Sequence, residues 1–188
     1  MLIADRLLSA DVADYVSFRA VCSAWRRCND DPPDDVLDRR FLPHLWTMLP
    51  DVVTRGRHRY SRFENIATKK HIQMRIPGLD GRHGRTFVAP TTEGLLVLLN
   101  KRTDAVWVLN PITGAHADLP SLNTLLYDYP RDLVFPRWTQ ELRLDAELDD
   151  DSSSVTIYFG GLLRLLGVAV PGDKAWTMVE TETDTDTE

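Results

Sequence analysis

The chain has 188 residues, 43% of them hydrophobic and 27% charged, and a formal net charge of −6 at pH 7. This composition is typical of a soluble globular protein with room for one ordinary domain and a small additional module. The net negative charge weighs against nucleic acid as the main partner.

We expect neither a membrane span nor a secretory leader. No apolar run approaches the roughly 20 residues that cross a bilayer, and the opening segment carries Asp5 and Arg6 within its apolar stretch. Only two cysteines are present, Cys22 and Cys28, and their spacing fits neither a disulfide framework nor a zinc pair. We therefore expect no membrane partner and a reducing compartment, which is the cytoplasm, the nucleus or both.

The first predicted element is a helix over residues 14–27. Its apolar side chains recur at spacings of three and four, so that one helical face carries Tyr15, Phe18, Val21, Cys22 and Trp25. Asp11 or Asp14 can cap its start. A module of about forty residues cannot bury enough surface to be stable alone, so this face needs a partner. Either another protein covers it, or the helix packs on the rest of the chain like any amphipathic helix.

Several short motifs in this region resemble the second half of an F-box. They are Leu7-Leu8-Ser9, Asp11-Val12-Ala13-Asp14, Phe18-Arg19-Ala20-Val21-Cys22 and Trp25-Arg26. An F-box is a helical hairpin that docks onto a Skp-type adaptor and so recruits substrates to a cullin-based ubiquitin ligase. The resemblance implies adaptor contacts from Leu7, Leu8, Phe18, Val21, Cys22, Trp25 and Arg26. Some of these residues, Trp25 above all, can instead hold the hairpin together.

One part of the F-box pattern is not matched. An F-box usually opens with a Leu-Pro-x-x-Leu-Leu segment, whereas residues 1–8 of this chain read Met-Leu-Ile-Ala-Asp-Arg-Leu-Leu. Each fully buried leucine contributes roughly 1.5–3 kcal/mol, and a loss of about 3 kcal/mol weakens a complex by roughly a hundredfold or more. We therefore expect a first helix that is only a stump, and adaptor binding that is weakened or lost.

An acidic, proline-containing segment then interrupts the helical pattern. Residues 29–35 read Asn-Asp-Asp-Pro-Pro-Asp-Asp, which neither a helix nor a strand can cross. We place the module boundary here, with an F-box remnant over 1–28, a linker over 29–40 and a β-domain over 41–179. Residues 180–188 contain no apolar side chain, and we expect a disordered, solvated acidic tail.

Residues 41–50 fit either a helix or a strand. Pro43 and Pro50 bracket a run that is too short for a helix. We therefore favour an extended strand with Leu45, Thr47 and Leu49 on one face.

Residues 54–75 are locally basic and allow two interpretations. One is a patch for nucleic acid or nuclear import, and the other is a solvated loop followed by strands with polar faces. Tyr60 and Phe63 interleave with the charges, but two aromatic residues without a recognised RNA-binding pattern are weak evidence. We favour the loop and strands.

The strongest strand pattern lies in the middle of the chain. Residues 94–99 form a continuous apolar run of strand length, which suggests burial on both faces. Residues 105–109 and 115–119 predict two further strands, and the segments at 100–104 and 110–114 read as turns. Strand, turn, strand, turn, strand is the meander of one propeller blade.

A similar pattern follows nearer the C-terminus. Residues 155–159, 163–170 and 175–179 are strand-like, and the Pro-Gly-Asp-Lys segment at 171–174 is a strong hairpin turn. Before them, residues 144–154 are rich in aspartate, and we expect an acidic loop there. Crowded carboxylates can bind calcium, but this segment lacks the glycine and the terminal glutamate of an EF-hand loop, so we favour a solvated connection.

The β-region carries motifs of its own that resemble plant F-box proteins with a KIB-type β-propeller domain. They are Leu45-Trp46-x-Met48-Leu49-Pro50, Glu93-Gly94-Leu95-Leu96, Asn110-Pro111-x-Thr113-Gly114 with Leu119-Pro120-Ser121-Leu122, and Pro171-Gly172-Asp173-Lys174-x-Trp176-Thr177. In that family the box holds the ligase and the Kelch-like propeller selects the protein to be ubiquitinated. No motif in this chain marks the residues that would contact a substrate.

The expected fold class is α+β, with a short N-terminal helical F-box remnant followed by an antiparallel, all-β partial β-propeller. We count about two blades, whereas closed propellers typically have four to eight. The chain is therefore expected to be truncated at both ends.

We do not expect an enzyme. The five histidines, His44, His58, His71, His83 and His116, lie on unrelated segments without a metal-binding motif. No Gly-x-Ser-x-Gly elbow, P-loop or dinucleotide fingerprint occurs, and the glycine-rich residues 78–84 lack the Gly-Lys-Ser/Thr ending that cradles phosphate. We expect no catalytic residues, no cofactor and no metal.

The sequence thus predicts a non-catalytic substrate-receptor subunit of a cullin-based ubiquitin ligase. Its expected partners are a Skp-type adaptor, through it a cullin, and an unknown protein substrate. Two alternatives stay open. One is a degenerate, truncated family member without ligase function, and the other is a nucleic-acid-binding protein that uses the basic region.

Overall fold

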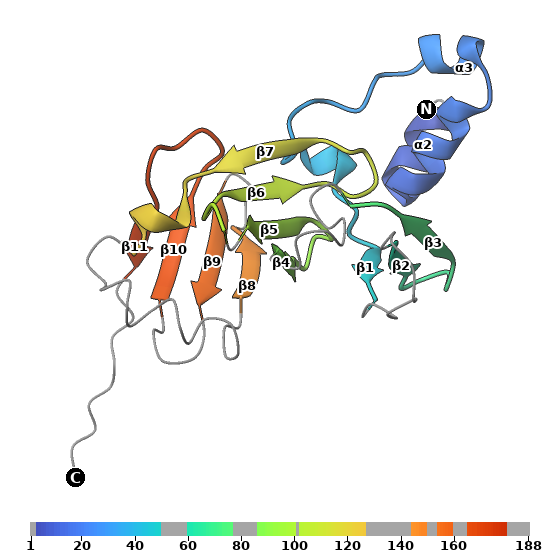
Figure 1. Cartoon of the computed structure of the whole chain (residues 1–188). Coiled ribbons are helices and arrows are strands. Elements are labelled where there is room, and N and C mark those ends of the chain that lie inside the picture. The colour runs from blue at the N-terminus through green and yellow to red at the C-terminus, as the bar shows by residue number, and fades with distance from the viewer. Residues whose placement is uncertain are drawn as a thin grey trace.

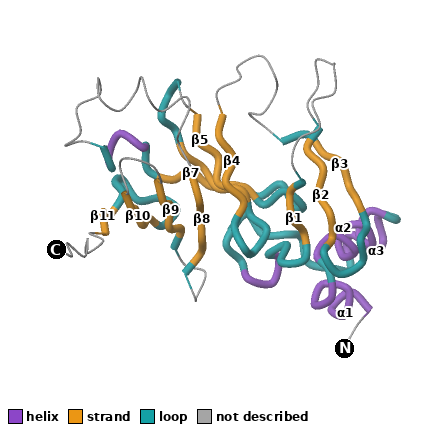
Figure 2. The backbone as a smooth tube through the Cα atoms, turned by 90° about the horizontal axis from the view of Figure 1, so that it is seen from below, coloured by secondary structure: helices purple, strands orange, loops and turns teal. Residues whose placement is uncertain are grey.

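The computed structural model describes residues 3–49, 60–76, 86–100, 102–126, 144–149, 154–159 and 165–179. Within these residues the fold is mostly β, with three short α-helices near the N-terminus followed by three antiparallel sheets. The sheets stand side by side in chain order, and the helices lie beside the first sheet (Figure 1, Figure 2).

The helical segment forms three helices instead of one continuous amphipathic helix. α1 spans Ile3–Ala10, α2 spans Val12–Ala20 and α3 spans Ser23–Arg27. Between α2 and α3 the backbone of Cys22 is extended, and its thiol accepts a hydrogen bond from the backbone N–H of Trp25. The predicted single helix over 14–27 is therefore wrong, because the chain turns before α3 and stacks Trp25 on Phe18.

Two other expectations for this segment agree with the structure. Asp11 caps α2, since its carboxylate accepts the backbone N–H of Ala13 at 2.8 Å. α1 has 8 residues, which is about two turns and fits the short first helix.

The three sheets are meanders in which neighbouring strands are antiparallel. The first contains β1 (Trp46–Met48), β2 (Ser61–Asn65) and β3 (His71–Met74). The second contains β4 (Thr86–Pro90), β5 (Leu96–Asn100), β6 (Val106–Leu109) and β7 (His116–Leu119). The third contains β8 (Leu144–Leu148), β9 (Val155–Phe159), β10 (Leu165–Ala169) and β11 (Thr177–Val179). Two short 3-10 helices, η1 (Arg39–Phe41) and η2 (Leu122–Thr124), precede β1 and follow β7.

The structure therefore has three sheets where the sequence suggested about two blades. Every strand expected in the second and third sheets is present, but β4 and β8 were not foreseen. Residues 144–148 were expected to belong to an acidic loop, and this expectation is wrong because they pair with β9 along their whole length. Asp145 and Glu147 are exposed on one face while Leu148 is buried on the other, so the acidic side chains conceal a half-buried strand.

β1 is shorter than the strand expected over 41–50, and its buried face is the opposite one. Trp46 is buried and Met48 is half-buried, whereas Thr47 is exposed. Thr47 instead lies in one row with Glu64 and His71 across the sheet. This row is the polar face that the basic region was expected to show, and only residues 60–75 of that region are described.

β5 lies at the centre of the core and is buried on both faces, as its continuous apolar run predicts. Val97 and Leu99 belong to the cluster shared with the third sheet. Leu96 and Leu98 belong to the cluster shared with Trp46 and Phe63 of the first sheet. The expected linker also contributes to the first of these clusters, through Val36 and Leu37.

Three hairpin turns repeat one pattern that begins with an asparagine. Asn65, Asn100 and Asn110 each accept two backbone N–H groups with their side-chain oxygen, from the residues two and three positions later. The fifth residue of each turn has a positive φ: Lys69 at 60°, Asp104 at 56° and Gly114 at 81°. The asparagine side-chain oxygen acts as an acceptor for backbone N–H groups within the turn, so the same local geometry occurs in the first sheet and twice in the second.

Candidate docking surface

The helices expose an apolar surface at the end of the molecule opposite β11 (Figure 1, Figure 2). Val21 is 63% exposed and Trp25 is 44% exposed. Phe18 is half-buried and stacks on Trp25, with ring centroids 4.4 Å apart and an interplanar angle of 23°. We call Phe18, Val21 and Trp25 the α3 patch. Protein–protein interfaces commonly use exposed aromatic and aliphatic side chains of this kind.

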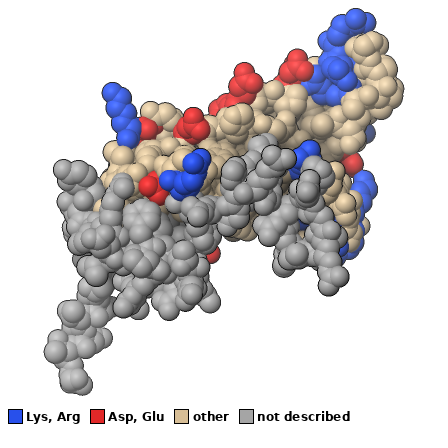
Figure 3. Space-filling model, in the orientation of Figure 1, with Lys and Arg blue, Asp and Glu red and all other residues tan. Residues whose placement is uncertain are grey.

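The α3 patch has polar and cationic neighbours. Cys22 and Arg26 are both exposed, so five of the seven predicted adaptor residues lie on this short segment of the chain. α3 ends with two arginines, Arg26 and Arg27, and Figure 3 shows Lys and Arg side chains gathered at this end of the molecule. The surface is therefore apolar at its centre and positively charged along one border.

The other two predicted adaptor residues mainly hold the helices together. Leu7 and Leu8 are half-buried and pack, like Phe18, against the cluster formed by Ala4, Val12, Tyr15 and Phe41. Only part of each leucine side chain is open to a partner.

Sequence reasoning missed one exposed apolar residue and one polar contact in this region. Ile3 is 70% exposed at the start of α1. On a helical wheel Ile3 lies at the edge of the apolar stripe formed by Ala4, Leu7 and Leu8, and this position could have predicted its exposure. The long-range contact of Asp11, described below, had no signal in the sequence beyond its role as a cap.

A buried arginine fixes α3 and the following segment against α2. Arg19 is 5% exposed, and its guanidinium donates to the backbone carbonyls of Asp30 and Arg26 and to the carboxylate of Asp31. The hydroxyl of Tyr15 donates to the same Asp30 carbonyl at 2.7 Å. Burial is the main cause that raises the pKa of Tyr15. These contacts hold Asp30 and Asp31, at the start of the acidic segment, against α2.

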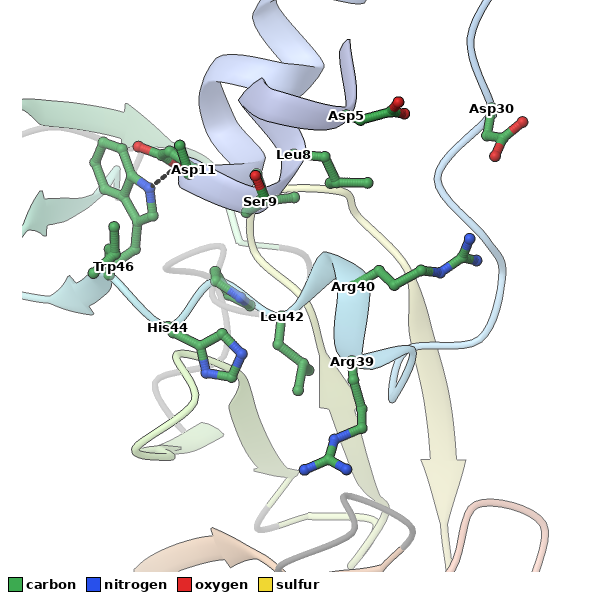
Figure 4. Close-up of a pocket in the computed structure, with 14 residues that line it drawn as sticks. Asp5, Leu8, Ser9, Asp11, Asp30, Arg39, Arg40, Leu42, His44 and Trp46 are labelled. Atoms are coloured by element: carbon green, nitrogen blue, oxygen red, sulfur yellow. Dashed lines mark hydrogen bonds between the residues drawn. The ribbon is translucent and has the colours of Figure 1, made fainter. Parts of the chain in front are cut away.

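The carboxylate of Asp11 joins the helices to the first sheet. Its Oδ1 accepts the indole N–H of Trp46 and its Oδ2 accepts the side-chain amide of Asn65, each at 2.8 Å. Figure 4 shows the Asp11 carboxylate beside the Trp46 ring, with the hydrogen bond as a dashed line. Both donors are buried, and the Asp11 carboxylate that they meet is partly buried.

A pocket of about 640 Å³ lies between the α1–α2 junction and the segment from η1 to β1. Its lining combines the carboxylates of Asp5 and Asp30 with the cationic side chains of Arg39 and Arg40 and with His44. Figure 4 shows Arg39, Arg40 and His44 pointing in different directions. They do not converge on one point where a charged ligand could sit, so the pocket has no assembled binding site.

Two lysines in the described part of the basic region form ion pairs within the protein. Lys69 binds Glu64 at 2.8 Å, and Lys70 binds Asp14 of α2 at 3.1 Å. The hydrogen bond from Lys69 is the main cause that lowers the pKa of Glu64. These pairings engage both lysines of this stretch with carboxylates of the protein itself.

The remaining expectations from the sequence concern metal binding, membrane spans and two further segments of the chain. Among the described residues, no group of three or more His, Cys, Asp or Glu side chains could hold a metal ion. None of the helices in this part of the chain is long and apolar enough to cross a bilayer. The glycine-rich residues 78–84 and the tail at 180–188 lie outside the described residues.

Comparisons of the chain with protein-family models, with curated proteins and with solved structures found no match.

Proposed function

We propose that this chain is a non-catalytic substrate-receptor subunit of a cullin-based ubiquitin ligase. The helices α1–α3 dock onto a Skp-type adaptor through the α3 patch, and the sheets select the protein to be ubiquitinated. The observation that carries this proposal is the exposure of Val21 and Trp25 within the segment that resembles an F-box.

The arrangement of the sheets supports a partial β-propeller as the substrate-selecting part. Each sheet is a meander, and the sheets follow one another in chain order. β4 and β8, the first strands of two successive four-stranded sheets, lie against each other. In a β-propeller the first strands of neighbouring blades meet in this way around the central channel.

The proposal is tested by co-purification of the full chain with a Skp-type adaptor. The double substitution Val21→Asp and Trp25→Ala places a charge in the α3 patch and removes its largest side chain, and it should abolish co-purification. The matched control is Val170→Asp with Met178→Ala, because both are exposed apolar side chains far from α3, in the β10–β11 turn and in β11. The control should co-purify like the wild type. Equal recovery of the two double variants would contradict the proposal.

A second comparison addresses the unmatched F-box opening. A variant preceded by a Leu-Pro-x-x-Leu-Leu segment should bind the adaptor more tightly than the chain itself, since buried leucines supply much of such an interface. If neither form binds the adaptor, the ligase role is excluded and the degenerate family member becomes the better explanation.

A further inference from the structure

One carboxylate receives hydrogen bonds from its own helix and from two strands that are distant in the sequence. Asp11 accepts from the backbone N–H of Ala13 in α2, from the indole of Trp46 in β1 and from the amide of Asn65 in β2. A carboxylate has about four acceptor sites, so all three bonds can form together.

The two sheet donors are held on a rigid base. Trp46 and Asn65 are paired positions of the β1–β2 ladder. The amide of Asn65 can face Asp11 in only one orientation, because its oxygen already accepts the backbone N–H groups of Ala67 and Thr68. Asn65 is 0% exposed and Trp46 is 4% exposed, so both donors are buried, while the Asp11 carboxylate itself is partly buried.

The other contacts between the helices and the sheets do not have this geometry. Lys70 and Asp14 form an ion pair whose side chains are both about half exposed, and such pairs hold a geometry weakly. Ile112, from the β6–β7 turn, packs against the helices through apolar contact, which has no direction. Among the described residues, only the Asp11 contact between the helices and the sheets combines buried donors, direction and three hydrogen bonds.

We propose that Asp11 is a positioning residue that fixes the orientation of α1–α3 on the first sheet. Whatever binds the α3 patch is then held at one angle to the sheets. Under the proposed function this would set where a captured substrate stands relative to the ligase, and that consequence rests on the proposed function. The fixed orientation itself does not.

The test measures a distance between the helices and the second sheet in the full chain. A spin label on Cys28, which is exposed at the end of α3, is paired with a second label on Arg102→Cys in the exposed β5–β6 turn. Cys22→Ser in all proteins prevents a third label. Pulsed electron–electron double resonance then gives the distribution of the distance between the two spin labels.

The wild type should show one narrow distance peak, and Asp11→Ala and Trp46→Phe should each lose it in favour of a broad distribution. Asp14→Ala is the matched control, because it removes an acid of the same helix that also bridges to the sheet, and it should keep the narrow peak. Trp46→Phe keeps an aromatic ring in place and decides the question if Asp11→Ala does not fold. A broad distribution in the wild type, or a narrow one in Trp46→Phe, would overturn the proposal.

The adaptor is absent from this measurement, so its outcome is independent of the ligase proposal. A narrow wild-type peak that broadens in Trp46→Phe, together with no adaptor binding, would establish the fixed orientation of the helices and exclude the ligase role. Adaptor binding with a broad wild-type distribution would show the reverse.

Discussion

The indole N–H of Trp46 donates to Oδ1 of Asp11 at 2.8 Å across 35 residues of sequence. Asp11→Ala would remove the cap of α2, which costs about 1 kcal/mol. It would also leave the buried donors of Trp46 and Asn65 unpaired, at about 1–3 kcal/mol each. We therefore expect the free energy of unfolding to fall by roughly 3 kcal/mol or more in urea titrations. Asp14→Ala should cost less than about 1 kcal/mol, and equal losses would show that the Asp11 contact adds nothing beyond capping.

Gly94 lies where the β4–β5 turn meets the chain that enters β1. Its φ is +84°, and a Cβ there would stand 2.3 Å from the carbonyl oxygen of Pro43 and 2.9 Å from that of Trp46. Both neighbours are backbone atoms that cannot rotate away. Gly94→Ala should therefore lower the free energy of unfolding by at least about 3 kcal/mol, from left-handed strain and from the clash.

Gly114→Ala is the matched control for this substitution. Gly114 has nearly the same φ, +81°, but nothing lies within 4 Å of the Cβ that would be added. Only the conformational cost applies, which is about 1–2 kcal/mol. Thermal or urea unfolding of the two variants separates the effects, and a Gly94→Ala loss no larger than that of Gly114→Ala would argue against the close approach of the two segments.

The strands that sequence patterns predict correctly are those whose signal is local. The apolar run of β5 and the turn around Gly114 need no distant contact to be recognised, and the structure has both. β8 was missed because its exposed acids dominate the composition, and its register with β9 is what makes it a strand. The break between α2 and α3 was missed because Trp25 stacks on Phe18 instead of continuing the helical face.

In the candidate site, too, some features have a local sequence signal and others depend on distant contacts. The spacing of aromatic and aliphatic residues pointed to the α3 patch, and the structure leaves Val21 and Trp25 exposed there. Which of them pack within the protein could not be predicted, since Leu7 and Leu8 are half-covered by a cluster that includes Phe41. A repeated Asn-x-x-Thr at Asn65, Asn100 and Asn110 was also present as a signal for three equivalent turns.

Lys69 occupies a turn position that favours glycine. Its φ of 60° lies in the left-handed region, which costs a residue with a Cβ about 1–2 kcal/mol. Lys69→Gly removes this strain and loses only an ion pair with Glu64 in which the lysine is largely exposed. We expect a net gain of about 0.5–1 kcal/mol in the free energy of unfolding. Lys70→Gly should instead lose about 0.5–1 kcal/mol or slightly more, because the φ of Lys70 is not positive and its ion pair with Asp14 is also removed. A loss of stability in Lys69→Gly would contradict the prediction.

Protonation of Asp38 at low pH should lower the free energy of unfolding. The carboxylate of Asp38 accepts hydrogen bonds from the Arg40 guanidinium at 3.1 and 2.6 Å. The hydrogen bond from the Arg40 side chain is the main cause that lowers the pKa of Asp38, and desolvation acts in the opposite direction. The folded-state pKa is therefore below the unfolded value of about 3.9. The resulting contribution to stability is complete above that pH and is lost as the pH falls through the folded-state pKa.

Asp38→Asn keeps a side chain that can cap η1 but removes this titration. The variant should be less stable than the wild type at neutral pH, and the difference should shrink as the pH is lowered from about 4 to about 2. Arg40→Gln removes the partner of the carboxylate and should show the same convergence. Urea unfolding at a series of pH values measures both differences. A difference that stays constant over this range would mean that the Asp38–Arg40 contact does not stabilise the folded state.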